Sequence, residues 1–314
     1  MSQPTPPKDT ALTPAFWSPA YPRIQIWRTL LGIITIHVIF FAVTIGVFFA
    51  GAAFLQTDVT QMLDVSPTRT AMIFVTFIGY HIGLWIVLRV LHKRGFRSLF
   101  GPARRVNWRH FRRGVLIALG VNLAAILVQM LQPFFLPTLP EASAAQSLPL
   151  ITWAILVIPA LILVFIQIFA EELVFRSYLL QQLRARFRSI WIWAILPSLI
   201  FGLLHFDPQT YGINAVFYVL HTTVIGIVLA VVTLRTGNIG AAAGLHFANN
   251  AMLIFSGTKG TLDGFSLFLS EMDLTSAHMG VSILSQTAVV LVAFLLWSRR
   301  AGHVQPIANT AQAD

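Results

Sequence analysis

Eight long apolar stretches dominate the sequence and restrict it to one structural class. A helix needs about 20 apolar residues to cross the hydrocarbon core of a bilayer, and each stretch reaches that length or comes close to it. Only 10% of the residues are charged, whereas a soluble domain carries about 25%, so most of the surface must face lipid. The sequence predicts an all-α, polytopic transmembrane helical bundle of about eight spans. The expected spans are Thr29–Leu55, Thr70–Leu91, Gly114–Gln132, Leu150–Leu183, Ile190–Phe206, Ile213–Leu234, Ile239–Phe255 and Met279–Ser298.

The distribution of Lys and Arg predicts the orientation of this bundle. Eight spans place both termini on one side. The loops on the opposite side contain only two basic residues, Arg69 and Lys259. Because cytoplasmic loops carry the excess of Lys and Arg, both termini are predicted to be cytoplasmic. The chain then divides into a polar, Pro-rich cytoplasmic tail (1–26), one transmembrane bundle (27–300) and a second cytoplasmic tail (301–314). We expect a multi-pass protein of a bacterial-type cell membrane.

The loop between Pro133 and Pro149 is expected to lack regular structure because its prolines remove hydrogen-bond donors.

One loop, residues 92–113, concentrates basic side chains without any acid. The net charge of +10 could indicate nucleic acid, but no soluble domain is available to present such a patch. A position between two apolar stretches instead predicts contact with anionic lipid headgroups. The absence of cysteine excludes disulfides, thiolate metal sites and a cysteine nucleophile. The basic residues are Lys93, Arg94, Arg97, Arg104, Arg105, Arg109, Arg112 and Arg113.

Two adjacent acids, Glu171 and Glu172, lie inside an apolar stretch. A charged group at the centre of a membrane helix costs roughly 2.5–3.5 kcal/mol on insertion scales, so both need compensation or a function. Arg176 follows Glu172 at i,i+4, which predicts an ion pair on one helix face. Glu171 lies about 100° around the helix and has no cation at that spacing. The alternative is that both acids lie in water at the membrane surface. However, the helix rises roughly 20 Å between Glu171 and Arg184, which favours a deep position and a general base.

Two histidines and an asparagine reach a similar depth from later spans. His205 ends the fifth stretch, whereas His246 and Asn250 share a helix face in the seventh. Together with the two acids, these residues predict a hydrolytic site inside the membrane. Other intramembrane histidines (His37, His81, His221) are expected to make interhelical hydrogen bonds.

The order and spacing of these residues resemble a known family. They are similar to the three motifs of the CAAX-protease and bacteriocin-processing family of intramembrane endopeptidases. That family includes the type II CAAX prenyl endopeptidases and the lysostaphin-resistance-like bacterial proteins. The resemblance covers about residues 150–255, the predicted protease core. Its motifs here are Glu171-Glu172-x-x-x-Arg176, Phe201-x-x-x-His205 and His246-x-x-x-Asn250.

The resemblance implies a chemical role for each residue. Glu171, assisted by His205, would activate a water molecule that attacks a peptide bond. His246 and Asn250 would stabilise the oxyanion of the tetrahedral intermediate. The implied protein is an intramembrane endopeptidase that acts on a membrane-associated peptide or protein, with CAAX-type or bacteriocin-type processing.

The resemblance leaves the cofactor open, because the family is often described as metalloproteases. Glutamate and histidine are ligand types that suit zinc, and a metal would use Glu171, His205 and His246. The motif H-E-x-x-H is absent, and a metal-free reaction through glutamate-activated water is the preferred reading. Both readings use the same residues, with Glu172 and Arg176 as the supporting pair.

Two other functions can use the same residues. Intramembrane glutamates and histidines form proton relays in ion-coupled transporters. A non-catalytic scaffold or immunity factor could also retain the fold without the chemistry. A transporter would move ions without cleaving peptides, and a scaffold would keep its effect after the loss of Glu171 and His205.

Overall fold

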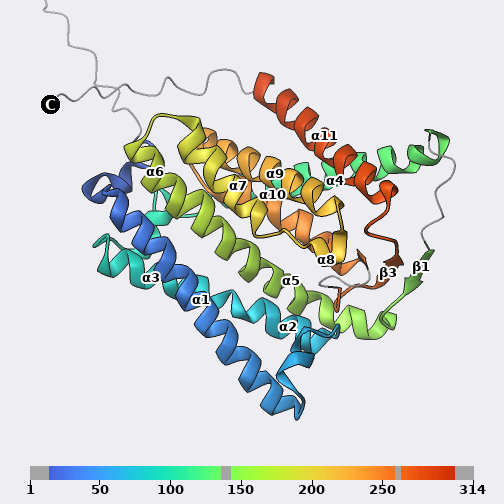
Figure 1. Cartoon of the computed structure of the whole chain (residues 1–314). Helices are drawn as coiled ribbons and strands as arrows, with labels where there is room; N and C mark the ends of the chain where they lie inside the picture. Colours follow the sequence, from blue (N-terminus) through green and yellow to red (C-terminus); the bar gives the residue numbers. More distant parts are fainter. Residues whose placement is uncertain (1–13, 136–142, 259–262, 301–314) are drawn as a thin grey trace, which may run out of the picture.

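The computed structural model describes residues 14–135, 143–258 and 263–300. Residues 1–13 of the predicted N-terminal tail and the whole predicted C-terminal tail, 301–314, lie outside the described residues. The remaining chain is a bundle of α-helices with one small sheet (Figure 1). The helices are α1 (Ile26–Leu55), α2 (Pro67–Thr76), α3 (Ile78–Val90), α4 (Trp108–Phe135), α5 (Leu150–Glu172), α6 (Leu180–Arg186), α7 (Leu196–Leu203), α8 (Pro208–Tyr211), α9 (Asn214–Thr236), α10 (Gly240–Ala251) and α11 (Ala277–Arg300).

Six helices among the described residues are long and apolar enough to cross a membrane. Two predicted spans are shorter than expected, because the apolar helix Trp191–Leu203 and α10 each fall below the length of a full crossing. The prediction of an all-α membrane bundle is confirmed, whereas the count of eight spans and the cytoplasmic termini stay predictions. The six candidates are Ile26–Leu55, Pro67–Val90, Trp108–Gln132, Leu150–Arg186, Asn214–Thr236 and Ala277–Arg299.

The helix that carries the two acids runs through the middle of the bundle and changes its winding there (Figure 1). The α-helix α5 ends at Glu172 and continues as a π-helix, η4 (Leu173–Leu179), before α6 begins. A second π-helix, η5 (Trp191–Ile195), precedes α7. Such wide turns are rare and occur frequently at functional sites. The sequence analysis predicted a single span, Leu150–Leu183, and did not predict either π-helix.

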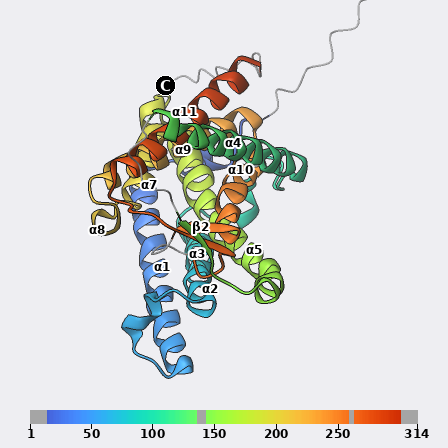
Figure 2. The same cartoon turned by 90° about the vertical axis from the view of Figure 1, so that its right-hand side faces the viewer.

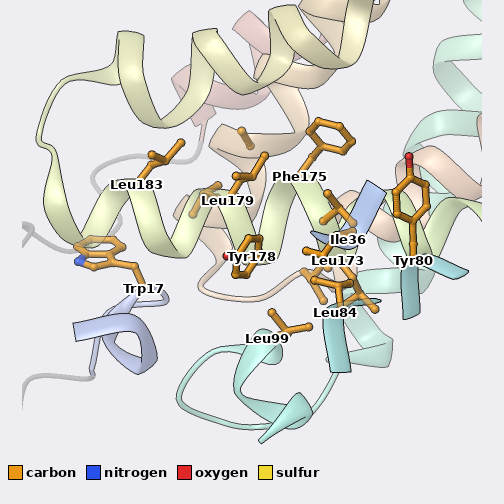
Figure 3. Packing of buried hydrophobic residues seen from close by; sticks show 14 of the residues in the cluster. Trp17, Ile36, Tyr80, Leu84, Leu99, Leu173, Phe175, Tyr178, Leu179 and Leu183 are labelled. Carbon is orange, nitrogen blue, oxygen red and sulfur yellow. The ribbon is translucent and has the colours of Figure 1, made fainter. Parts of the chain in front are cut away.

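The largest hydrophobic core surrounds η4 and α6 (Figure 3). Tyr178 and Leu173 are fully buried there, against Leu84 of α3 and Ile36 of α1. A short 3₁₀ helix, η1 (Ser18–Arg23), follows Trp17, which is also buried in this core. The predicted N-terminal tail therefore includes a segment that packs against the bundle.

Glycines bring α4 and α10 into close contact (Figure 2). A Cβ atom at Gly114 of α4 would collide with the carbonyl oxygen of Ala241, and one at Gly244 of α10 would collide with that of Phe111. Small residues let two membrane helices approach at backbone distance. This contact fixes the position of the α10 turn that carries His246.

A three-stranded sheet closes one end of the bundle. Its strands are β1 (Ser143–Gln146), β2 (Ser256–Thr258) and β3 (Phe268–Glu271), in the order β1-β3-β2. β1 pairs antiparallel to β3 and β2 pairs parallel to it. The expectation of no regular structure between Pro133 and Pro149 is therefore wrong for Ser143–Gln146, because a distant segment supplies the pairing partner.

A side-chain amide fastens α4 to α11 near the same end. Gln132 Nε2 donates to Ser285 Oγ at 3.3 Å, and Gln132 Oε1 accepts from Ser282 Oγ at 3.2 Å. Gln132 is buried, so both halves of its amide are satisfied within the bundle.

Candidate active site

The predicted site residues gather around one cavity of about 840 Å³. Helices α4, α5, α9, α10 and α11 form its walls, and η6 (Met252–Ile254) and β2 line its end near the sheet. Glu171, His205, His246 and Asn250 all line this cavity. Residues from three separate segments therefore meet at one surface that can hold water and a substrate.

Glu172 is fully buried beside two positively polarised partners. Arg176 Nη1 lies 3.1 Å from its Oε1 atom, and His246 Nδ1 lies 2.9 Å from the same oxygen. The side chains of Glu172 and Arg176 are 0% and 2% exposed. A buried charge pair is stable only with further hydrogen bonds, and the His246 ring supplies one. Glu172 thus orients the imidazole rather than lining the cavity.

Arg176 reaches Glu172 from the first wide turn of η4. Its guanidinium carbon lies 4.3 Å from the centroid of the Phe201 ring, so the cation also rests on an aromatic face. A cation over an aromatic ring is stabilised more strongly where water is excluded. The motif residue Phe201 therefore supports the buried pair of the first motif.

Glu171 belongs to a second, separate network. Its Oε1 accepts a hydrogen bond from Gln167 Nε2 at 2.7 Å, and Gln167 Oε1 accepts one from Asn250 Nδ2 at 3.1 Å. Its Oε2 lies 3.6 Å from His246 Nε2 and has no hydrogen-bond partner among the described residues. One oxygen of this carboxylate is held in place, and the other is buried without a hydrogen bond among the described residues.

His205 lies at the end of α7, with its orientation set by its own helix. Its Nδ1 is 2.8 Å from the carbonyl oxygen of Phe201. Because a carbonyl only accepts, Nδ1 carries the proton and Nε2 is the basic atom of the neutral ring. The ring lies edge-on to Phe201, at 4.8 Å between centroids, and to Tyr218 of α9, at 6.1 Å.

The donor set does not assemble into a metal site. Among the described residues, no group of three or more His, Asp or Glu side chains is arranged to hold a metal ion. His246 has its Nδ1 committed to Glu172, and its Nε2 lies at 3.6 Å from Glu171. In this arrangement, Glu171, His205 and His246 do not form such a group, and the reaction is derived from the side chains alone.

The structure adds residues that the sequence analysis did not assign. Gln167 links the first and third motifs through its amide, and its spacing of four residues before Glu171 is a signal that could have found it. Tyr218 lies beside His205 from a different helix, and no local pattern indicates that contact. The other intramembrane histidines differ from expectation in part. His37 and His81 bond to carbonyls four residues earlier rather than to another helix.

Comparison with known proteins agrees with this geometry. Residues 152–252 match the family model described as type II CAAX prenyl endopeptidase Rce1-like. The chain is also 30% identical over 171 residues to the uncharacterized protein YyaK of Bacillus subtilis (strain 168). That alignment covers 54% of this chain and 55% of YyaK, so the chain spans about half the length of the curated relative that it matches.

The matched residues, 152–252, contain all three motifs and include α9, α10 and nearly all of α5, which contribute to the cavity wall. The resemblance inferred from the motifs is thereby confirmed, and in this segment the chain is similar to the Rce1-like type II CAAX prenyl endopeptidases.

Proposed function

We propose that this protein is an intramembrane endopeptidase in which Glu171 activates the water that cleaves a membrane-associated peptide. The observation that carries this proposal is the state of the Glu171 carboxylate. Gln167 holds one oxygen of this cavity-lining residue, and the other is buried without a hydrogen bond among the described residues. A carboxylate with a free, fixed oxygen in a low-dielectric site is suited to accept a proton from water.

The reaction follows from the atoms that face the cavity. Glu171 Oε2 takes a proton from water, and the water oxygen bonds to the carbonyl carbon of the scissile peptide. The carbonyl π electrons move onto oxygen, and the resulting oxyanion needs donors that are already in place. When the intermediate collapses, the C–N bond breaks and the proton held by Glu171 passes to the leaving amine. His205 Nε2 can accept a hydrogen bond from the second O–H of the attacking water and so orient it.

The roles of His246 and Asn250 are constrained by their hydrogen bonds. His246 Nδ1 is bonded to the Glu172 carboxylate, so Nε2 donates to an oxyanion only when the ring carries a second proton. Oxygens of the Glu171 and Glu172 carboxylates lie 3.6 Å and 2.9 Å from Nε2 and Nδ1 of this ring. Asn250 Nδ2 uses one hydrogen for Gln167 and keeps a second for the oxyanion.

The substrate class follows from the family and from the cavity wall. Apolar residues of α4, α9 and α11 line much of the cavity, which suits a substrate with a lipid-like segment. The family match makes a prenylated peptide with a C-terminal CAAX sequence the first substrate to test.

The test uses the whole protein in liposomes with a farnesylated CAAX peptide and mass spectrometry of the released fragment. We expect cleavage by the wild type, and a loss of about 10²- to 10⁴-fold in the Glu171→Gln variant, the usual contribution of a general base. Retention of full activity by Glu171→Gln would overturn the proposal. Ion flux without cleavage by the wild type would indicate a transporter instead.

A matched pair of histidine variants separates chemistry from packing. His205 and His81 each hold their Nδ1 against a carbonyl four residues earlier, but only His205 lines the large cavity. His205→Ala is expected to reduce cleavage strongly, whereas His81→Ala is expected to leave it unchanged. An equal loss in both variants would show that the effect comes from the helices and not from the site.

A further inference from the structure

A third histidine lines the candidate active-site cavity and has no role in the three motifs. His221 lies in α9, is 8% exposed and contributes to the same cavity wall as Glu171 and His205. Its Nδ1 lies 2.8 Å from Thr287 Oγ1 of α11. The expectation of an interhelical hydrogen bond is therefore confirmed for His221, and this bond uses only one of its two ring nitrogens.

The Thr287 hydroxyl determines which nitrogen of His221 carries the proton. Thr287 Oγ1 donates its single hydrogen to the carbonyl oxygen of Ile283 at 2.7 Å. Its oxygen can therefore only accept from His221, so the proton of the neutral imidazole lies on Nδ1. Nε2 is left as an acceptor, and no hydrogen bond involves it among the described residues.

The same arrangement recurs in the two histidines of the predicted site. His205 Nδ1 is held by the Phe201 carbonyl and His246 Nδ1 by the Glu172 carboxylate. In each case, a fixed acceptor on Nδ1 directs the other nitrogen to the cavity, as an ordered second partner orients a functional imidazole. His81 has the same Nδ1 arrangement outside this cavity, so the property that sets these three histidines apart is their position in the cavity wall.

The position of His221 places it along the path of a substrate. The Tyr218 ring contacts both imidazoles, at 6.1 Å from His205 and 6.5 Å from His221 between ring centroids, so the two imidazoles are at most about 13 Å apart. An extended peptide advances about 3.3 Å per residue. A peptide that runs from His205 toward His221 therefore reaches it within about four residues.

We propose that His221 is a substrate-binding residue whose Nε2 accepts a hydrogen bond from a backbone N–H near the scissile bond. This inference rests on the proposed function. A peptide loses its hydration when it enters the cavity, and an N–H left without an acceptor there is unfavourable. Around His221, the wall is mostly apolar, with Ile225, Leu229 and Val290 as neighbours on α9 and α11, so a fixed acceptor has a large effect. Thr287 lies outside the segment 152–252 that matches the family, so α11 contributes to substrate binding in this chain.

The test replaces the non-scissile amides of the farnesylated peptide by esters, one at a time, which removes a single N–H and keeps the chain length. In the wild type, we expect one ester within about four residues of the scissile bond to lower kcat/KM roughly 5- to 30-fold. His221→Ala is expected to lower kcat/KM for the all-amide peptide by a similar factor, mainly through KM, and to lose its sensitivity to that ester. His221→Gln, which restores an acceptor oxygen, is expected to recover part of both effects.

Two further variants keep the test decisive if His221→Ala fails to fold. Thr287→Val keeps the imidazole but removes the partner that fixes its proton, so the penalty for the ester is expected to shrink. His81→Ala, outside the large cavity, is expected to show the wild-type pattern. An ester scan that is identical in the wild type, His221→Ala and Thr287→Val would overturn the inference while leaving the proposed function intact. Failure of the wild type to cleave any peptide would instead reject the proposed function.

Discussion

Gln167 donates a hydrogen bond to Glu171 at 2.7 Å from one turn earlier on α5, and its other amide atom accepts one from Asn250 of α10. A single buried amide therefore joins the first motif to the third. Since both the nitrogen and the oxygen of this amide are engaged, neither Glu171 nor Asn250 can turn away without breaking a buried hydrogen bond.

Replacing Gln167 by Leu should disorder both partners while keeping the volume of the side chain. We expect kcat for peptide cleavage to fall on the order of 10- to 100-fold, because small misplacements of catalytic groups have effects of this size. The measurement is the initial rate of fragment release in liposomes, with the melting temperature as a control for folding. An unchanged kcat would show that Glu171 is oriented without this amide.

The chain contains a buried and an exposed ion pair that can be compared directly. Arg176 and Glu172 are 2% and 0% exposed, whereas Arg69 and Asp64 are 23% and 58% exposed at a similar distance. Arg176→Ala leaves a buried carboxylate uncompensated and should destabilise the protein by about 3–5 kcal/mol. Arg69→Ala should cost less than about 1 kcal/mol. Thermal unfolding in detergent micelles checks both, and similar losses for the two would contradict the burial argument.

The glycine contact between α4 and α10 predicts a position-dependent effect of alanine. At Gly244, a Cβ atom would collide with the Phe111 carbonyl, and overpacking of this kind costs about 1–3 kcal/mol. At Gly120 of the same α4 helix, a Cβ would meet no atom within 4 Å. Gly244→Ala should therefore lower both stability and cleavage, because it displaces the turn before His246. Gly120→Ala should preserve both, and a loss there would show that α4 packs differently.

Stability should depend on pH through His92, which follows the second long helix. Burial, assisted by the nearby cations of Arg94, Arg28 and Arg23, lowers the pKa of His92 from 6.5 to about 4. The unfolded chain then binds a proton below pH 6.5 that the folded protein does not bind until about pH 4. Stability should be complete above pH 6.5 and decrease as the pH falls toward 4, by no more than about 3 kcal/mol.

The measurement is thermal unfolding of the wild type and of His92→Gln from pH 7.5 down to 4.5. The wild type is expected to lose stability in this window, and His92→Gln is expected to lack this loss because it has no imidazole. The imidazole contacts Tyr178 and Gln182, so the variant keeps a polar group in the same buried cluster. Parallel curves for the two proteins would assign the pH dependence to other groups.

Local spacing was sufficient to predict part of the candidate site. The Glu172–Arg176 pair follows from i,i+4 geometry within one helix, and the π turn that holds Arg176 does not break the contact. The same rule applied to Gln167 would have predicted its bond to Glu171. Each of these contacts depends only on residues one turn apart, so the sequence contains the information that positions them.

Contacts between distant segments could not be predicted in this way. β1 contains Ala144 and Ala145, which have little strand preference, and it forms a strand only because Phe268–Glu271 pair with it. The position of Tyr218 beside His205 likewise depends on how α9 packs against α7. The apolar stretches predicted which segments form helices and that the motif residues share a depth, whereas the contacts among them required the coordinates.

The amide of Gln132 and the small sheet restrain α4 and α11 at the same end, since β1 lies between α4 and α5 and β3 directly precedes α11. Farther along both helices, Arg113 and Trp297 lie on the walls of the cavity, where no such clasp is present among the described residues. We expect relative movement of α4 and α11 to be smallest at this fastened end and largest at the opposite end, next to the basic loop. A bulky substrate would then enter beside the basic loop while the contacts at the fastened end stay intact.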